Sequence, residues 1–258
     1  MHISLLQTDL VWADKNANLR QTEEKLTALV GKTDLVVLPE MFTTGFCTDS
    51  PNLAEPMNGE TVQTLCRWAK TYNLALTGSF IAAENGNIYN RAFFVFPSGE
   101  IHTADKRHLF TVGGEDKLFK AGGKKLILSY KWLNICVLVC YDVRFPVWAR
   151  NVNNEYDLLV YVANFPVQRI DVWDTLLPAR AIENQAYVCG VNRVGVDGMN
   201  LSYPGHSVLL DFKGKPLLQF SENESAVKTA SISKSELDKF REKYAFWQDA
   251  DKFQIIRP

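Results

Sequence analysis

The feature that most constrains the fold is a series of short apolar runs without the alternation of polar and apolar residues. Leu35-Val36-Val37-Leu38-Pro39 and the run from Leu158 to Ala163 are apolar throughout. Such runs are typical of parallel strands that are buried on both faces. Segments with helical spacing separate them, as at Leu19, Leu26 and Leu29. Strands that alternate with helices along a chain predict an α/β fold.

The expected elements can be placed along the chain by these patterns. Helices are expected from the N-cap Asp14 to Gly31, over residues 60–72, near 147–151 and over 176–185. Strands are expected at 3–7, 35–39, 74–80, 126–129, 133–139, 158–163, 187–194, 207–211 and 216–220, with a hairpin at 91–96 and 101–105. No linker-like stretch interrupts them. We therefore expect a single domain over residues 1–258 with mixed sheets, in which residues 244–258 form a tail that packs on the domain or on a partner subunit.

The charge balance excludes several classes of partner. The 258 residues carry 28 basic and 29 acidic side chains, a net charge of -1. A net charge this close to zero provides no basic surface for a nucleic acid or an anionic membrane, so neither partner is expected.

The apolar runs are far shorter than the roughly 20 residues that cross a bilayer. The N-terminus lacks the basic region of a signal peptide, and we expect a cytoplasmic location.

The five cysteines form an odd set without a C-x-x-C pair, which favours a reducing compartment over a disulfide framework. We expect most of them to be buried packing residues, although one of them could be a nucleophile. They are Cys47, Cys66, Cys136, Cys140 and Cys189. The four histidines are scattered without a metal-binding spacing, so no metal is expected.

Four of the predicted strands end in a polar or reactive side chain. Functional sites of α/β sheets gather at the carboxyl ends of strands. The residues at these ends are Glu40, Lys106, Cys140 and Asn164. Three of them also have a purely structural interpretation: an ion pair for Glu40, a solvated charged turn for Lys106, and a buried core thiol for Cys140.

Cys140 has the most distinctive surroundings of the four. Tyr141 and Asp142 follow it, and a short helix is expected from Pro146. A strand, a nucleophile and a helix in this order resemble a nucleophile elbow with a thiol in place of a serine. The helix N-terminus would favour a thiolate and would present backbone N–H groups to an oxyanion. His108 as the base of a Cys-His pair is a weaker alternative, because Glu40 and Lys106 are better placed at strand ends.

Three blocks of the sequence resemble the signature blocks of the nitrilase superfamily, the carbon-nitrogen hydrolases. They are Leu38-Pro39-Glu40-Met41-Phe42, Asp105-Lys106-Arg107-His108-Leu109-Phe110, and residues 138–146 around Cys140. Gly113-Gly114-Glu115 is similar to the block that carries the second glutamate of these enzymes. The similarity runs from about residue 3 to the tail.

Within the superfamily, other segments are most similar to bacterial ω-amidases of the 2-oxoglutaramate amidase type. They are residues 41–46, Asn164-Phe165-Pro166 and residues 246–250. The resemblance implies a four-layer α-β-β-α sandwich, a homodimer formed through the helices, and no metal or organic cofactor. It also implies cleavage of the terminal amide of a small dicarboxylate monoamide to the acid and ammonia.

The resemblance also assigns roles to residues. Glu40 would take the proton of Cys140, and the sulfur would attack the amide carbonyl. Lys106 and the backbone N–H of Tyr141 would hold the oxyanion. Glu40 would then protonate the departing ammonia and activate water to hydrolyse the thioester. Glu115 would orient Lys106 and that water.

Further substrate contacts are predicted from position alone. Phe42, Asn164 and Phe165 are candidates for the pocket wall. Arg144, just past the nucleophile, would bind the substrate carboxylate, or would form a buried salt bridge with Asp142 or another acid.

Two classes of alternative remain open. N-carbamoyl amino acid hydrolases, aliphatic amidases and nitrilases share the same triad, so only pocket residues separate them. A binding or scaffold member of the family would predict a substituted triad, whereas all three residues are present here.

Overall fold

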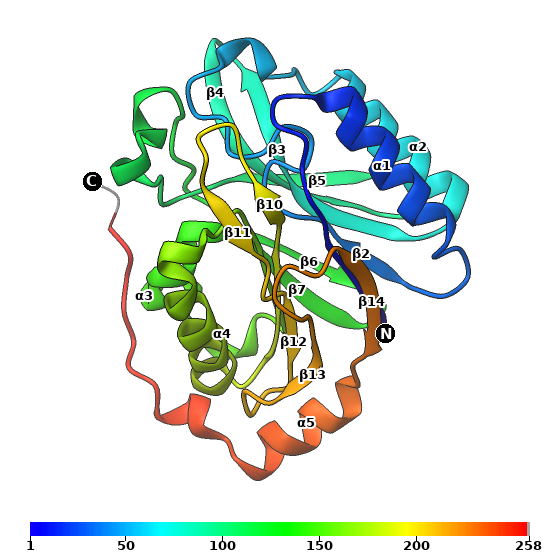
Figure 1. Cartoon of the computed structure of the whole chain (residues 1–258). Coiled ribbons are helices and arrows are strands. Elements are labelled where there is room, and N and C mark those ends of the chain that lie inside the picture. Colours follow the sequence, from blue (N-terminus) through cyan, green and yellow to red (C-terminus); the bar gives the residue numbers. More distant parts are fainter. Residues whose placement is uncertain (257–258) are drawn as a thin grey trace.

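The computed structural model describes residues 1–256 and consists of two mixed six-stranded sheets that pack face to face (Figure 1). The first sheet has the order β14 (Ala226–Ser231), β1 (His2–Gln7), β2 (Leu35–Val37), β3 (Ala75–Glu84), β4 (Asn87–Val95) and β5 (Ile101–Asp105). The second has the order β13 (Pro216–Gln219), β12 (Val208–Leu210), β9 (Tyr187–Asn192), β8 (Leu158–Ala163), β7 (Leu133–Val139) and β6 (Leu126–Tyr130). Strands β10 (Val194–Val196) and β11 (Ser202–Pro204) form a separate hairpin.

Helices cover the outer face of each sheet, which confirms the expected four-layer α-β-β-α sandwich. The first sheet is covered by α1 (Lys15–Thr27) and α2 (Glu60–Tyr72), and the second by α3 (Pro146–Ala149) and α4 (Ile170–Asn184). Asp14 caps α1 as predicted, because its side chain accepts a hydrogen bond from the backbone N–H of Ala17. A last helix, α5 (Lys234–Lys243), follows β14. No helix within residues 1–256 is long and apolar enough to cross a membrane.

Side-chain alternation along each strand explains why the apolar runs are unbroken. Leu35 and Val37 point into the core between the two sheets, whereas Val36 and Leu38 pack in the core beneath α1 and α2. Successive residues of a strand face opposite sides of its sheet. Because both sides of β2 are covered, every position of the run is apolar.

Each sheet has three adjacent parallel strands, β1-β2-β3 in one and β7-β8-β9 in the other. Glu40 lies past the end of β2, Cys140 directly follows β7, and Asn164 directly follows β8. Lys106 directly follows β5, the edge strand of the first sheet. The sheet packing brings these four strand ends together.

Several element boundaries differ from the predicted ones. Strand β4 begins at Asn87 rather than at residue 91, and α4 begins at Ile170 rather than at 176. Strand β14 and helix α5 were not predicted. β14 is a short edge strand whose sequence has few large apolar residues, and α5 buries only Leu237 and Arg241. The sequence of β14 lacks the apolar run of the other strands, and α5 is a ten-residue helix in a strongly polar segment.

The backbone packs closely around Gly122, which lies beside the end of β5. A side chain at Gly122 would bring its Cβ to 2.0 Å from the carbonyl oxygen of Asp105, and the Gly122 N–H donates to the carbonyl of Lys106 at 2.8 Å. We expect Gly122→Ala to lower the free energy of unfolding by about 1–3 kcal/mol, since the clash is with backbone. Urea unfolding measures this change. Ala121→Ser, at the exposed neighbour, should stay within about 0.5 kcal/mol of the unsubstituted protein. A Gly122→Ala variant as stable as this control would contradict the prediction.

Candidate active site

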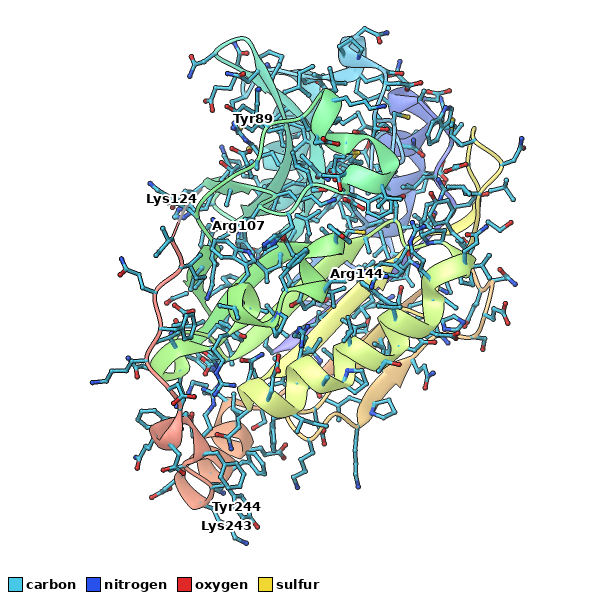
Figure 2. The ribbon with its side chains drawn as sticks, turned by 90° about the vertical axis from the view of Figure 1, so that its left-hand side faces the viewer. Tyr89, Arg107, Lys124, Arg144, Lys243 and Tyr244 are labelled. Atoms are coloured by element: carbon cyan, nitrogen blue, oxygen red, sulfur yellow. The ribbon has the colours of Figure 1, made fainter. Side chains whose placement is uncertain are left out.

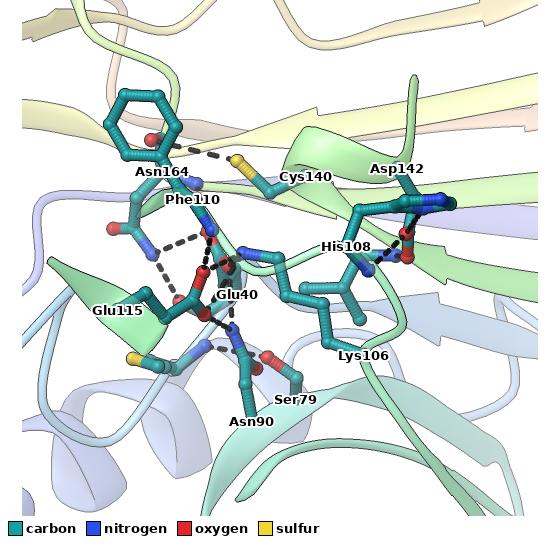
Figure 3. Close-up of polar contacts among 12 residues, drawn as sticks. Glu40, Ser79, Asn90, Lys106, His108, Phe110, Glu115, Cys140, Asp142 and Asn164 are labelled. Carbon is teal, nitrogen blue, oxygen red and sulfur yellow. Dashed lines mark hydrogen bonds and ion pairs between the residues drawn. The ribbon is translucent and has the colours of Figure 1, made fainter. Parts of the chain in front are cut away.

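The strand ends meet at a cavity of about 260 Å³ between the sheets and the loops above them. Cys140, Lys106 and Asn164 line it. Figure 3 shows that Glu40, Lys106 and Glu115 lie together beside Cys140. The structure therefore brings together all of the sequence-predicted triad and the second glutamate.

The centre of the site is the Lys106 ammonium, which lies between two buried carboxylates. Its Nζ donates to Glu40 Oε1 at 3.0 Å and to the two Glu115 oxygens at 3.0 and 2.9 Å. All three side chains are at most 1% exposed. Buried charges are stable when they are paired and fully hydrogen-bonded, so the arrangement requires each of its members.

Further donors satisfy every oxygen of these carboxylates. Asn90 Nδ2 donates to Glu40 Oε1 at 2.8 Å and to Glu115 Oε1 at 3.0 Å. The backbone N–H of Asn164 donates to Glu40 Oε2 at 2.9 Å, and that of Phe110 to Glu115 Oε2 at 2.6 Å. Two anions and one cation leave one net negative charge, which these neutral donors stabilise.

The backbone is strained at two of the strand ends. Met41, after Glu40, and Cys140 both have a φ of +44°. A non-glycine residue in the left-handed region costs about 1–3 kcal/mol and is common at functional sites. The Met41 N–H donates to Ser79 Oγ at 2.9 Å, and the Val139 N–H donates to Asp142 Oδ2 at 3.1 Å. These bonds hold the turns that direct Glu40 and Cys140 toward each other.

Asp142 connects the cysteine turn to the lysine loop. Its Oδ1 accepts from the His108 backbone N–H at 3.1 Å and lies 2.7 Å from His108 Nδ1. The His108 ring stacks on Phe145 at 3.6 Å between centroids. His108 thus supports the turn rather than the thiol. Asp142 also makes no salt bridge with Arg144, so the structural alternative for Arg144 was wrong about this partner.

The electrostatics of the site keep the resting thiol protonated. Burial and the Glu40 carboxylate raise the pKa of the Cys140 thiol well above its usual range, against the opposing effect of Lys106. The expectation of a thiolate favoured by a helix N-terminus is therefore not met. Burial alone would lower the pKa of the Lys106 ammonium, but Glu115 and Glu40 outweigh it and raise that pKa. Lys106 is a permanent cation, and Cys140 needs a base.

The wall of the cavity differs from the prediction in one residue. Tyr141, Arg144, Asn164 and Phe165 line it, together with residues that were not predicted. Phe42 does not: its ring packs edge-on against Phe93, at 5.9 Å, in the core beneath α1 and α2. Because the backbone turns at the left-handed Met41, the Phe42 ring and the Glu40 side chain lie on different sides of the chain. This correction removes Phe42 from the wall.

Phe46 and Asn90 are the main site residues that the sequence analysis missed. Phe46 lines the cavity, and its ring centroid lies 5.4 Å from Lys106 Nζ. Asn90 is fully buried between two carboxylates. Asparagine is uncommon inside strands, which is a signal that could have marked it, but the predicted strand began at residue 91.

The fold and the buried triad define a class of enzyme. The chain belongs to the carbon-nitrogen hydrolase family, whose sequence model matches residues 2–242. Its members hydrolyse carbon-nitrogen bonds, and this chain is such a hydrolase. Among the residues that the structure describes, no group of three or more His, Cys, Asp or Glu side chains is placed to hold a metal ion.

Particular relatives are similar over nearly the full length. The omega-amidase YafV of Escherichia coli K12 is 42% identical, covering 99% of this chain and 98% of that protein. The 2-oxoglutaramate amidase of Bacillus subtilis is 32% identical, covering 97% of each. The structure of XC1258 from Xanthomonas campestris, a CN-hydrolase superfamily protein with an arsenic adduct in its active site, is 39% identical. It has a TM-score of 0.96 and covers 99% of this chain and 98% of that chain.

The raised pKa of Cys140 can be measured directly. The usual pKa of a free cysteine is about 8.5. We expect no thiolate absorbance from Cys140 between about pH 6 and that value. The ultraviolet difference between the unsubstituted protein and Cys140→Ala isolates this thiol. In Glu40→Gln the thiolate should form at lower pH, because one cause of the raised pKa is removed. A thiolate already present at neutral pH in the unsubstituted protein would show that Cys140 needs no base.

Proposed function

We propose that this enzyme hydrolyses the terminal amide of a small dicarboxylate monoamide, of the 2-oxoglutaramate or 2-oxosuccinamate type, to the acid and ammonia. The observation that carries the proposal is the buried Lys106 ammonium, held between Glu40 and Glu115 and beside the Cys140 thiol in a small cavity. The names of the Escherichia coli and Bacillus subtilis relatives support the substrate class.

In the first step, Glu40 accepts the proton of the Cys140 thiol as the sulfur bonds to the amide carbonyl carbon. The carbonyl π electrons move to oxygen and form a tetrahedral oxyanion. The protonated Glu40 then gives its proton to the nitrogen as the carbon-nitrogen bond breaks. Ammonia leaves, and the acyl group remains on Cys140 as a thioester.

The oxyanion is stabilised by a cation and a backbone donor. Lys106 keeps its charge because its pKa is raised. The backbone N–H of Tyr141 lies in the first turn of the 3₁₀ helix over Cys140–Arg144, where helix donors have no intrahelical partner. Each preorganised donor of this kind contributes about 2.7–4 kcal/mol to the transition state.

In the second step, water hydrolyses the thioester, and Glu40 again acts first as a base and then as an acid. Glu40 takes a proton from a water molecule that attacks the thioester carbonyl, and the Cys140 sulfur leaves and regains that proton. Glu115 holds Lys106 through both of its oxygens and orients the ammonium during the two steps. One carboxylate thus serves as base and acid in turn, and no histidine is required.

Arg144 is a candidate for the substrate carboxylate. It lines the cavity, is half-buried, and forms no ion pair within residues 1–256. The main role of Asn164 is to position Glu40, since its Nδ2 donates to the Glu40 backbone carbonyl at 2.7 Å. Phe165 supplies an apolar surface to the cavity.

We also propose that the chain is a single domain that acts as a homodimer in the cytoplasm. Exposed apolar residues on α3, on α4 and in the tail support an interface, among them Val147, Ile182 and Phe253. Five free cysteines fit a reducing compartment. Sedimentation velocity distinguishes a dimer from a monomer. A monomer would contradict the proposed interface.

Substitution of the nucleophile tests the mechanism. Cys140→Ala and Cys140→Ser should abolish ammonia release from 2-oxoglutaramate, because neither leaves a thiol to form the thioester. Thermal unfolding should remain close to that of the unsubstituted protein, since both changes are small. Cys136→Ser, at a buried cysteine outside the cavity, is the matched control and should keep activity in whatever fraction folds. Ammonia release by either Cys140 variant would refute the mechanism.

A substrate panel separates this function from its alternatives. Ammonia release should be fastest from 2-oxoglutaramate and slower from glutamine, N-carbamoyl amino acids and simple nitriles. Hydrolysis of nitriles without hydrolysis of oxo-acid amides would overturn the substrate class.

A further inference from the structure

Two arginines in the cavity wall have no charged partner. Arg144 and Arg169 both line the cavity with Cys140, and within residues 1–256 neither forms an ion pair or a side-chain hydrogen bond. The fully buried arginines, by contrast, are paired: Arg91 binds Asp105 at 2.6 Å, and Arg241 binds Asp157 at 2.7 Å. Arg144 and Arg169 are half-buried and line the cavity with their guanidinium donors unused by the described residues.

Aromatic rings hold these two guanidinium groups in place. Arg169 Cζ lies 4.6 Å from the ring centroid of Phe110, and Arg144 Cζ lies 6.0 Å from that of Tyr141. Phe110 and Tyr141 are themselves in edge-to-face contact at 5.1 Å. A guanidinium over a ring is attracted through its face and keeps its N–H edges free to bind a carboxylate.

The other charged side chains of the cavity wall are already occupied. Lys106 is bound by two carboxylates. Asp197 Oδ1 accepts from the N–H groups of Met199 and Leu201 at 2.8 and 3.0 Å, and its Oδ2 accepts from the Tyr203 hydroxyl at 2.8 Å. Both Asp197 oxygens are thus occupied, and among the described residues of the wall Arg144 and Arg169 are the charged groups with hydrogen-bond donors free for a ligand.

We propose that Arg169 is a specificity-determining residue that binds, together with Arg144, the carboxylate at the end of the substrate remote from the scissile amide. The inference rests on the proposed function and assigns the residues that recognise the carboxylate of its substrate. Arg144 comes from the turn after β7 and Arg169 from the loop after β8. The substrate carboxylate is thus held between two strand ends, and its amide end is directed to Cys140.

A pair of substrates with the same scissile amide tests this role. Glutaramate carries a carboxylate at its other end, and glutaric diamide carries a neutral carbamoyl group there. The unsubstituted enzyme should prefer glutaramate in kcat/KM. Arg169→Met should reduce this preference by about ten- to a hundredfold, the range for loss of a charge-assisted hydrogen bond. The loss should be mainly in KM, with kcat/KM for the diamide unchanged.

Two further variants separate binding from structure. Arg169→Lys should keep part of the preference, because the charge remains but the planar fork is lost. Arg107→Met is the matched control: Arg107 also lies 4.6 Å over a ring, that of Trp148, but does not line the cavity. Arg107 and Arg144 are labelled in Figure 2. An unchanged preference in Arg169→Met, or a parallel loss on both substrates, would overturn the proposal.

A binding measurement distinguishes failure of this proposal from failure of the proposed function. Glutarate should protect the enzyme from thermal unfolding, because a ligand that binds only the folded protein stabilises it, and Arg169→Met should lose this protection. Protection that depends on Arg169 in an enzyme that hydrolyses no ω-amide would support the anion site and refute the function. Protection that is absent, or unchanged in Arg169→Met, would refute the anion site.

Discussion

Two carboxylates buried next to each other repel, and one of them takes up a proton unless a cation lies between them. Lys106 is that cation. Its ammonium pairs with both Glu40 and Glu115, and the two carboxylates in turn fix its position and raise its pKa. Removing the Lys106 ammonium would leave two buried carboxylates without a cation, and loss of one partner costs about 3–5 kcal/mol in comparable buried pairs. The roles that we propose for the Cys140 thiol, for its base Glu40 and for the oxyanion donors all depend on this cluster.

The fold provides the cluster by packing two sheets whose strand ends meet. Glu40 comes from the first sheet through β2, and Cys140 from the second through β7. Two left-handed residues, Met41 and Cys140, turn the chain sharply at these ends. The apolar core between the sheets packs around Cys140, and a separate cluster of Cys47, Ile81 and Phe119 packs around Met41, so both strained turns are held by packing. Burial in this packing is also the largest cause of the raised pKa of the Cys140 thiol.

Much of this could be predicted from residues near each other in the sequence. The apolar runs predicted the buried strands, and polar residues at their ends predicted Glu40, Lys106 and Cys140 as a group. The misses involve contacts between distant segments. Asn90 reaches Glu40 and Glu115 from a strand whose start was placed too late. Phe42 was assigned to the wall because it follows Glu40, yet the turn at residue 41 directs it into the core. Arg169 lies in a loop without periodicity, and only its place beside Phe110 marks it.

The proposed mechanism requires that a protonated Cys140, activated by Glu40, carries the acyl group during turnover. Rapid acid quenching of the enzyme during hydrolysis of a slow ω-amide, followed by peptide mass spectrometry, detects that acyl group. We expect an acyl thioester on the Cys140 peptide that is absent from the Glu40→Gln protein. An acyl group on any other cysteine, or the same amount of Cys140 thioester without the Glu40 carboxylate, would contradict this mechanism.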